Sequence, residues 1–363
     1  MAKLAELGTI ITGNTPKTAD AQNYATNDIC FVKPSDIVDG EVNHLSNTEF
    51  YISEYARSKA RIIPPNSVLV TCIGIVGKVA INEVECAFNQ QINAIVPETA
   101  KCIPEYIAFA LQSKQMMMQD IANAAVVPIL NKAQFSEICI HVPSLEDQSV
   151  IVEKMNKISE LISLRKEQLA KLDQLVKARF IELFGDPIAN NMKLPTERLE
   201  LRFNLKAGIT TAADSIHDFE EGKFEVPCYG GNGIRGYVEE KSYSGNYPII
   251  GRQGALCGNV QYATGEFHAT EHAVLVSLLK DDNTVWVYHL LKLMDLFRFH
   301  TGAAQPGLAV KTLNSIDVIV ADRELQNQFA AFAEQTNKTK LTIQASLDKL
   351  EVMKKALMQE YFG

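Results

Sequence analysis

A segment of 17 residues occurs twice in the chain, 178 residues apart. Residues 169–185 are LAKLDQLVKARFIELFG and residues 347–363 are LDKLEVMKKALMQEYFG. The copies match in register at Leu169/Leu347, Lys171/Lys349, Leu172/Leu350, Ala178/Ala356, Phe184/Phe362 and Gly185/Gly363. Both copies have the apolar spacing of a helix. A repeat at this distance indicates two copies of one larger structural plan.

The repeat extends into the residues that precede each helix. With small changes of offset, NSVLVTCIGIVGKVA (66–80) resembles NYPIIGRQGALCGNV (246–260), and AFNQQINAIV (87–96) resembles HATEHAVLVS (268–277). PEYIAFALQ (104–112) and VYHLLKLMD (287–295) each predict an amphipathic helix with Tyr near its start. The sequence therefore predicts an α+β fold with two mixed α/β domains, each followed by a long helix. We expect the domains at 1–145 and 187–322 and the helices at 146–186 and 323–363.

The two long helices have a narrow apolar stripe. Apolar residues alternate steps of four and three, and Arg165, Arg179, Lys340 and Lys354 interrupt the pattern. Such a stripe, about five heptads long, favours one partner helix, and antiparallel pairing of the two helices as a coiled coil is the simplest solution. The alternative is that each helix packs on its own domain. The residues that we expect in the pairing are Ile158, Ile162, Leu169, Leu172, Val176, Ile343, Leu347, Leu350 and Leu357.

Composition restricts the classes of protein to consider. The net charge is −8, and both domains carry more acidic than basic side chains, so a nucleic-acid role would need local patches or partners that supply phosphate contacts. The seven cysteines are scattered without a C-x-x-C pair, which favours reduced thiols in a cytoplasm. We expect no membrane span, because no apolar run reaches about 18 residues, and no secretory signal at the N-terminus.

Catalytic motifs are few. The sequence has no phosphate-binding loop, no G-x-S-x-G elbow, no H-E-x-x-H and no (Asn/Asp)-Pro-Pro-Tyr methyltransferase motif. HATEH (268–272) fits the H-x-x-E-H zinc pattern, but it leads into a strand-like segment instead of a helix, and its counterpart NQQ has no histidine. We expect this stretch to be a turn, and we predict no metal site and no catalytic residue.

Polar residues at the turns between strands are the candidate ligand contacts. Asn, Gln and Arg are the side chains that make bidentate contacts with base edges, and neighbouring glycines allow close approach of a ligand to the backbone. The alternative is ordinary turn chemistry. The candidates are Asn14, Lys17, Lys33, Lys78, Asn89, Gln90, Gln91, Tyr229, Asn232, Arg235, Arg252, Gln253, His268 and Lys311. Corresponding loops carry different side chains, as two domains that recognise different ligands would.

Over its whole length the chain resembles the specificity subunit of a type I restriction-modification system. The resemblance rests on the repeated plan and on TGNTPKT (12–18), PSLEDQ (143–148), TGAAQPGL (301–308) and the LFG and YFG helix ends. It implies that each α/β domain recognises one half of a split double-stranded DNA site. It also implies that the paired helices set the spacing and dock two methyltransferase subunits, which use S-adenosylmethionine, and that restriction subunits join this core. No cofactor is implied for this chain itself.

The sequence departs from the family pattern at two places. NAAVVPIL (123–130) replaces the T-G-x-x-Q-P segment in the first copy, and DREL-QNQ lacks the proline of PSLEDQ. Two other interpretations stay open. One is the recognition subunit of another bipartite system, such as a type IIB enzyme. The other is a coiled-coil tether with two protein-binding heads, which the acidic charge favours.

Overall fold

The computed structural model describes residues 1–123, 128–302 and 306–363 and contains two compact units. Unit 1 comprises residues 1–165 and 346–363, and unit 2 comprises residues 166–345. Both long helices, α5 (Leu145–Phe184) and α9 (Arg323–Phe362), contribute to both units. In the part of the chain that is described, no helix is long and apolar enough to cross a membrane.

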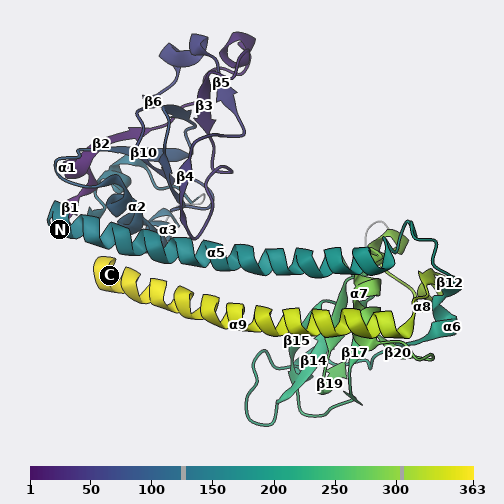
Figure 1. Cartoon of the computed structure of the whole chain (residues 1–363). Helices are drawn as coiled ribbons and strands as arrows, with labels where there is room; N and C mark the ends of the chain where they lie inside the picture. The colour runs from purple at the N-terminus through teal and green to yellow at the C-terminus, as the bar shows by residue number, and fades with distance from the viewer. Residues whose placement is uncertain (124–127, 303–305) are drawn as a thin grey trace. The chain divides into compact units, whose positions relative to one another are not determined.

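Unit 1 is built around a five-stranded sheet, β2-β10-β7-β8-β4, and a four-stranded sheet, β5-β3-β9-β6. β1 and β11 form a short separate pair, and β11 is the last strand before α5 in the sequence. The strands are β1 (Ala2–Lys3), β2 (Gly8–Thr12), β3 (Ile29–Val32), β4 (Val42–Leu45), β5 (Tyr51–Ile52), β6 (Ile62–Ile63), β7 (Val68–Thr71), β8 (Val79–Asn82), β9 (Cys86–Phe88), β10 (Ile92–Pro97) and β11 (Cys139–Ile140). The helices are α1 (Leu4–Leu7), α2 (Pro104–Ser113), α3 (Gln115–Ala122), α4 (Lys132–Ser136) and two 3₁₀ turns, η1 (Ala21–Tyr24) and η2 (Glu54–Lys59). Figure 1 shows α2 packed against the larger sheet, on β7 and β8.

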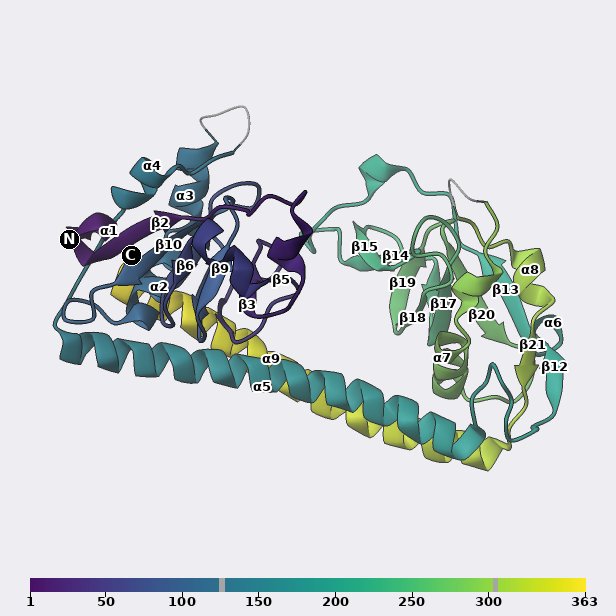
Figure 2. The same ribbon diagram turned by 90° about the horizontal axis from the view of Figure 1, so that it is seen from above.

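Unit 2 repeats the plan with a four-stranded sheet, β13-β20-β17-β18, a second one, β15-β14-β19-β16, and the short pair β12-β21. The strands are β12 (Thr196–Arg198), β13 (Phe203–Ala207), β14 (Val226–Gly230), β15 (Gly233–Val238), β16 (Tyr243–Ser244), β17 (Tyr247–Gly251), β18 (Val260–Ala263), β19 (Glu266–Ala269), β20 (Ala273–Leu278) and β21 (Asp317–Ile319). The helices are α6 (Leu199–Arg202), α7 (Thr284–Leu293), α8 (Val310–Asn314) and two 3₁₀ turns, η3 (Ala213–Ser215) and η4 (Leu296–Phe299). The order β2-β10-β7-β8 corresponds to β13-β20-β17-β18, and the parallel pair β3–β9 corresponds to β14–β19 (Figure 2). The predicted fold class is confirmed.

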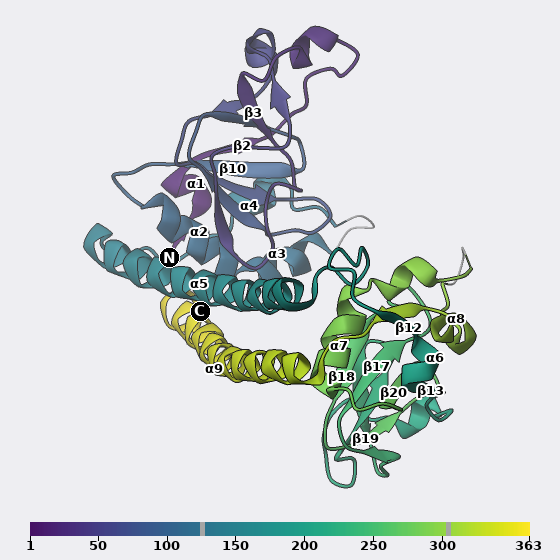
Figure 3. The ribbon, with the colours of Figure 1, turned by 45° about the vertical axis from the view of Figure 1, so that its right-hand side comes forward.

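The core of unit 2 lies where α7 meets the long helices. α7 packs on β17 and β18 on one side (Figure 3). On the other side the fully buried Trp286 stacks on Phe180 of α5, with ring centroids 6.4 Å apart. Phe180 in turn lies edge-on to Phe329 of α9 at 5.3 Å. The end of α5 and the start of α9 therefore share the core of unit 2, and neither helix packs only on the domain that precedes it.

Within each unit, opposite ends of the two long helices lie side by side. In unit 2, Asp173 of α5 pairs with Lys340 of α9 at 2.5 Å. Further along α5, Phe180 packs on Phe329, which comes earlier than Lys340 in α9, so the two helices run antiparallel in this unit. In unit 1, Lys154 of α5 donates to the hydroxyl of Tyr361 at 3.1 Å. Of the predicted stripe, Ile158, Ile162, Val176 and Leu347 are buried, and Leu169, Leu172, Ile343, Leu350 and Leu357 are half-buried.

The sequence alignment of the two shorter helices was three residues out of register. α2 begins at Pro104 and α7 at Thr284, so the counterpart of Tyr106 is Trp286 and not Tyr288. Tyr106 packs on Phe362 at 5.2 Å and Trp286 on Phe184 at 5.8 Å, and these two phenylalanines are also repeat partners. In each copy one large aromatic side chain of the shorter helix is buried against a long helix, and this burial sets the register in which α2 and α7 correspond. Matching the tyrosines of the two helices gives a different register.

A glutamine fastens the start of each long helix to the start of a shorter helix, α2 in unit 1 and α7 in unit 2. Gln148 accepts a hydrogen bond from the backbone N–H of Ile103 at 2.9 Å, and Gln326 accepts one from Asn283 at 2.8 Å. Each glutamine is buried and also donates to a backbone carbonyl at the start of its long helix. These bonds satisfy the free N–H groups at the start of α2 and α7. The Gln of PSLEDQ and its counterpart in DREL-QNQ therefore position the helices.

Gly185 ends α5. Its φ of 74° is left-handed, and its N–H donates to Ile181 at 2.8 Å. A glycine adopts this conformation at no steric cost, and Pro187 prevents further helix.

Candidate nucleic-acid interface

In unit 1, two turns and one later loop meet at the ends of β7 and β10. The N–H of Cys72, just after β7, donates to Gln91 at 2.7 Å, and the carbonyl of Cys72 accepts from Leu130 at 2.9 Å. The N–H of Gly13, after β2, donates to Ile92 at 3.0 Å. A Cβ at Gly13 would stand 2.1 Å from the Asn89 carbonyl, so only glycine fits.

Unit 2 makes the same backbone bonds with different residues. The N–H of Arg252 donates to His272 at 3.1 Å, and its carbonyl accepts from Leu308 at 2.8 Å. Gly208 takes the place of Gly13, and a Cβ there would stand 2.2 Å from the Ala269 carbonyl. The backbone frame at these loop tips is therefore repeated, whereas Cys72 is replaced by Arg252 and Gln91 by His272.

Two of the candidate residues at the turn between β9 and β10 of unit 1 hydrogen-bond to each other. Asn89 is buried, donates to the Gln91 side chain at 2.9 Å and accepts from the Gln91 N–H at 3.0 Å. Gln90 is exposed, and its side-chain oxygen accepts from Thr15 at 2.6 Å. Asn14 stands next to Thr15 in the sequence, and its side chain donates to the Lys59 carbonyl at 2.8 Å. Asn14, Gln90 and Gln91 thus belong to one group of tips around the β2 end.

The three candidate lysines of unit 1 have different settings. Lys17 is exposed. The ammonium of Lys33 lies 3.0 Å from the ring centroid of Phe50, a cation–π contact. The ammonium of Lys78 donates to the carbonyls of Pro34 and Ile37, the former at 2.8 Å. Lys78 therefore fastens the loop after β3, and this role was not visible in the sequence.

In unit 2, Arg235 and Gln253 are exposed on the β15 strand and the loop after β17. Asn232 accepts a hydrogen bond from the side chain of Asn259. The ring of Tyr229 packs on Phe267 at 5.5 Å, and burial raises the pKa of Tyr229. Lys311 is exposed on α8, on a different element from the tip residues.

His268 lies on β19 with both ring nitrogens engaged. Nε2 is 2.8 Å from the hydroxyl of Thr211, and Nδ1 hydrogen-bonds Ser242. Burial lowers the pKa of His268, so the ring is neutral at physiological pH. HATEH is a strand end and a turn here, and among residues 1–123, 128–302 and 306–363 no three His, Cys, Asp or Glu side chains are arranged to hold a metal ion.

Sequence reasoning missed the turn 270–272 as a site of its own. Glu271 accepts from the N–H of Thr211 at 3.2 Å and lies 3.3 Å from Nε2 of His272. Its pKa is lowered although its burial acts to raise the pKa, because these hydrogen bonds and the nearby His272 and Arg235 outweigh burial. The signal was present, because this turn corresponds to Asn89–Gln91, all three of which were candidates.

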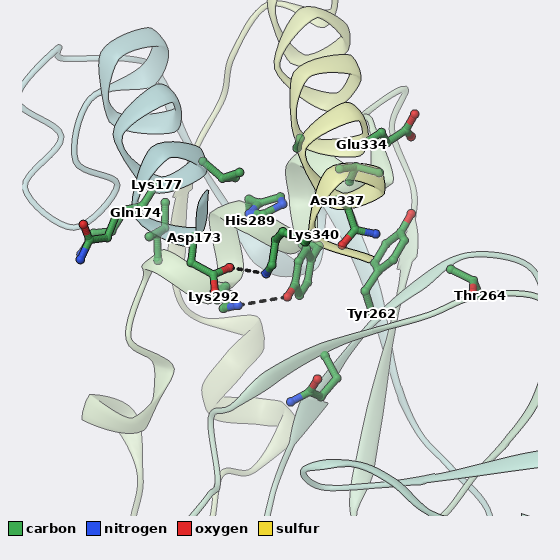
Figure 4. Close-up of a pocket in the computed structure, with 16 residues that line it drawn as sticks. Asp173, Gln174, Lys177, Tyr262, Thr264, His289, Lys292, Glu334, Asn337 and Lys340 are labelled. Atoms are coloured by element: carbon green, nitrogen blue, oxygen red, sulfur yellow. Dashed lines mark hydrogen bonds and ion pairs between the residues drawn. The ribbon is translucent and has the colours of Figure 1, made fainter. Parts of the chain in front are cut away.

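A groove of about 660 Å³ in unit 2 lies between α7 and the long helices (Figure 4). Its wall contains the Asp173–Lys340 pair and Lys292, whose ammonium donates to the Tyr288 hydroxyl at 3.2 Å. Burial, with the charges of Lys292 and Lys340, lowers the pKa of His289 to about 4. The charges on this groove are mixed, and none of the DNA-contact candidates lines it.

The fold consists of two α/β domains that repeat one loop frame with different side chains, and each domain continues into a long helix. Residues 1–174 match a sequence model described as the type I restriction modification DNA specificity domain. The chain is 32% identical over 355 residues to the type I restriction enzyme EcoprrI specificity subunit of Escherichia coli, covering 92% of this chain and 86% of that protein. The chain belongs to the family of type I restriction enzyme specificity subunits, the non-catalytic DNA-recognition members of these enzymes.

Other relatives agree. The MjaIX specificity subunit of Methanocaldococcus jannaschii is 28% identical over 188 residues, which cover 51% of this chain and 43% of that protein. Among solved structures, the type I restriction-modification S subunit from M. genitalium has a TM-score of 0.65 at 16% identity, with 100% of this chain and 95% of that chain covered. A chain from a study of type I complex assembly has a TM-score of 0.57 at 16% identity, covering 99% and 96%. At these identities the structures support the fold.

Proposed function

We propose that the chain recognises a bipartite, asymmetric DNA site. Residues 1–145 would recognise one half-site and residues 187–322 the other. The long helices, 146–186 and 323–363, would set the distance between the half-sites. The complex would work in the cytoplasm.

The observation that carries this proposal is the repeated loop frame with dissimilar side chains. Cys72 and Arg252 make the same two backbone bonds, one of which joins them to Gln91 and His272 respectively. A frame that is kept while its side chains change supports two recognition surfaces of one kind with two different targets.

The long helices support the docking of partner subunits. On α5, Val150, Leu161, Leu164 and Leu175 are exposed, and their spacing of three and eleven places them on one helix face. On α9, Leu341 and Val352 are exposed and also eleven residues apart. Because water-exposed leucine and valine stripes favour burial, we propose that two methyltransferase subunits cover these faces and that restriction subunits join them. S-adenosylmethionine would bind in the methyltransferase.

The excess of acidic over basic side chains fits a chain whose partner subunits supply part of the DNA contacts. Residues 1–145 carry ten basic and fourteen acidic side chains, and residues 187–321 carry twelve and fifteen. Phosphate contacts supply most of the affinity of a DNA-binding protein, so partner subunits would provide many of them.

The test is to co-express the chain with its methyltransferase subunit and to map modified adenines across the host DNA. We expect a split motif with a fixed gap and two unlike halves. A methyltransferase active in the complex that modified adenines without any such motif would refute the proposal. Methyltransferase expressed alone is the control.

A further inference from the structure

Three residues at the loop tips of unit 2 each carry one buried side-chain atom without a hydrogen-bond partner. Within the described residues these atoms are Nε of Arg252, Oγ1 of Thr270 and Nδ1 of His272. The backbone holds these residues together, because Arg252 and His272 share a hydrogen bond of 3.1 Å and Thr270 and His272 belong to one turn. We refer to these three residues as the Arg252 cluster.

Next to the Arg252 cluster, two backbone segments approach each other so closely that position 251 has room only for glycine. A Cβ at Gly251 would stand 2.0 Å from the carbonyl of Gly231. The N–H of Thr270 donates to the Tyr229 carbonyl at 2.9 Å, which ties the turn to β14. The backbone that carries these side chains is therefore fixed before any ligand arrives.

Unpaired buried donors and acceptors cost free energy, and a charged donor costs most. Arg252 has no ion-pair partner in the part of the chain that is described, and its side chain is half-buried. Neighbouring Glu271 already binds the N–H of Thr211 and lies beside His272. A half-buried guanidinium without an ion-pair partner, held at a loop tip, points to a binding site rather than to a packing element.

We propose that Arg252 recognises a guanine in the half-site of unit 2, an assignment that rests on the proposed function. The guanidinium is a planar fork of donors, and guanine offers O6 and N7 as paired acceptors in the major groove. Adenine offers a donor in place of O6 and is rejected.

Unit 1 has no arginine at the position that corresponds to Arg252. The counterpart of Arg252 is Cys72, whose thiol is neutral at physiological pH because burial raises its pKa to about 11. The counterpart of His272 is Gln91, which is already bonded to Asn89. The guanine preference is therefore assigned to one half-site only, and the asymmetry of the target begins at this position.

The test compares Arg252→Ala and Arg252→Lys with the wild-type chain, each in complex with its methyltransferase subunit. We expect one G·C position in one half-site to lose its preference by on the order of 10- to 100-fold, while all other positions keep theirs. Arg252→Lys keeps the charge but loses the fork, so it should lose the same position with less loss of overall binding. Arg198→Ala, an exposed arginine of unit 2 paired with Glu200 at 3.8 Å, is the matched control.

The outcomes separate this inference from the proposed function. A wild-type complex without a split motif would defeat the proposed function. A split wild-type motif that both Arg252 variants leave unchanged would overturn the guanine assignment alone. A uniform loss at every position, with a weaker salt dependence, would identify Arg252 as a phosphate contact and would also overturn it. Arg252→Lys guards against misfolding of the alanine variant, and fluorescence of Trp286, the single tryptophan of the chain, checks the fold of unit 2.

Discussion

Unit 1 and unit 2 differ most clearly beneath the loop tips, beside the two fastening glutamines. In unit 2 the guanidinium of Arg202 binds Asp282 through two nitrogens, at 2.7 and 3.1 Å, and Asp282 also accepts from Gln326 at 2.8 Å. The corresponding residues of unit 1 are Leu7 and Cys102, both buried. The same helix start is thus held by a buried ion pair in one unit and by apolar contact in the other.

This difference shows which features the frame requires. The glutamine bonds, the glycines of close approach and the aromatic side chain on the long helix occur in both units. The charge at the Arg202 position does not. The two units therefore share a backbone arrangement, and each unit stabilises it with different side-chain interactions.

The largest expected effect comes from exchanging whole domains. Replacing residues 1–145 with those of a relative that has a different known target should change one half of the modified motif completely and leave the other half and the gap intact. The reason is that the recognition tips of unit 1 all lie in this segment. Mapping of modified adenines measures the result. A change in both halves would mean that the two units do not recognise DNA independently.

The next effect is on stability. Arg202→Leu should lower the free energy of unfolding of unit 2 by about 3–5 kcal/mol, because it leaves the buried Asp282 charge without its cation. The double variant Arg202→Leu with Asp282→Cys recreates the Leu7–Cys102 pair of unit 1 and should recover most of the loss. Urea unfolding followed by Trp286 fluorescence gives both values. Equal losses in the two variants would contradict this account.

A smaller effect should follow pH. The folded pKa of His289 is about 4 and its ordinary value 6.5, so the unfolded chain binds the proton first. Unit 2 should therefore lose stability as pH falls from 6.5 towards 4, by a total of about 3 kcal/mol from this residue. Above pH 6.5 both states are neutral and the contribution disappears.

The matched variant for this prediction is His289→Phe, because Phe109 stands at the same position of α2 in unit 1. Carboxyl groups titrate in both proteins, so the difference between wild type and variant isolates His289. Lys292 and Lys340 lower its pKa and Asp173 raises it, and all three remain in the variant. Identical stability curves at pH 7 and pH 4.5 for the two proteins would show that His289 is not protected from protonation.

The smallest effect is expected at the Asp173–Lys340 pair. Asp173 is 62% exposed and Lys340 29%, so the pair is largely screened by water. A double-mutant cycle with Asp173→Asn and Lys340→Gln should give a coupling of about 0.2–1 kcal/mol. A coupling above about 2 kcal/mol would mean that the groove excludes water in solution.

The sequence predicted what depends on local periodicity and on the repeat. The long helices, the α/β plan and the cap at Gly185 follow from spacing, glycine and proline. The Arg202–Asp282 pair was not predictable, because it joins residues 80 positions apart whose counterparts, Leu7 and Cys102, are apolar.

For the candidate site, the residue types of the turns predicted which loops carry polar side chains. They did not predict which of these side chains are already hydrogen-bonded within the chain. Lys78 and Arg252 both looked like free cations beside glycines, yet Lys78 is bound by two carbonyls and Arg252 is left with an unpaired nitrogen. That difference depends on how the loop after β3 folds over β8, which residue types alone do not determine. The departure at 123–130 and the TGAAQPGL segment at 301–308 fall partly on residues outside those described.

The paired glutamine fastenings have a consequence for domain exchange. Gln148 and Gln326 make the same bonds to the starts of α2 and α7, so the joint between an α/β domain and the long helix that follows it is the same in both copies. The repeated helix ends, residues 169–185 and 347–363, stand on either side of unit 2's α/β domain. Exchange of that domain at these joints would give the proposed recognition of one half-site a new target without any change to the rest of the chain.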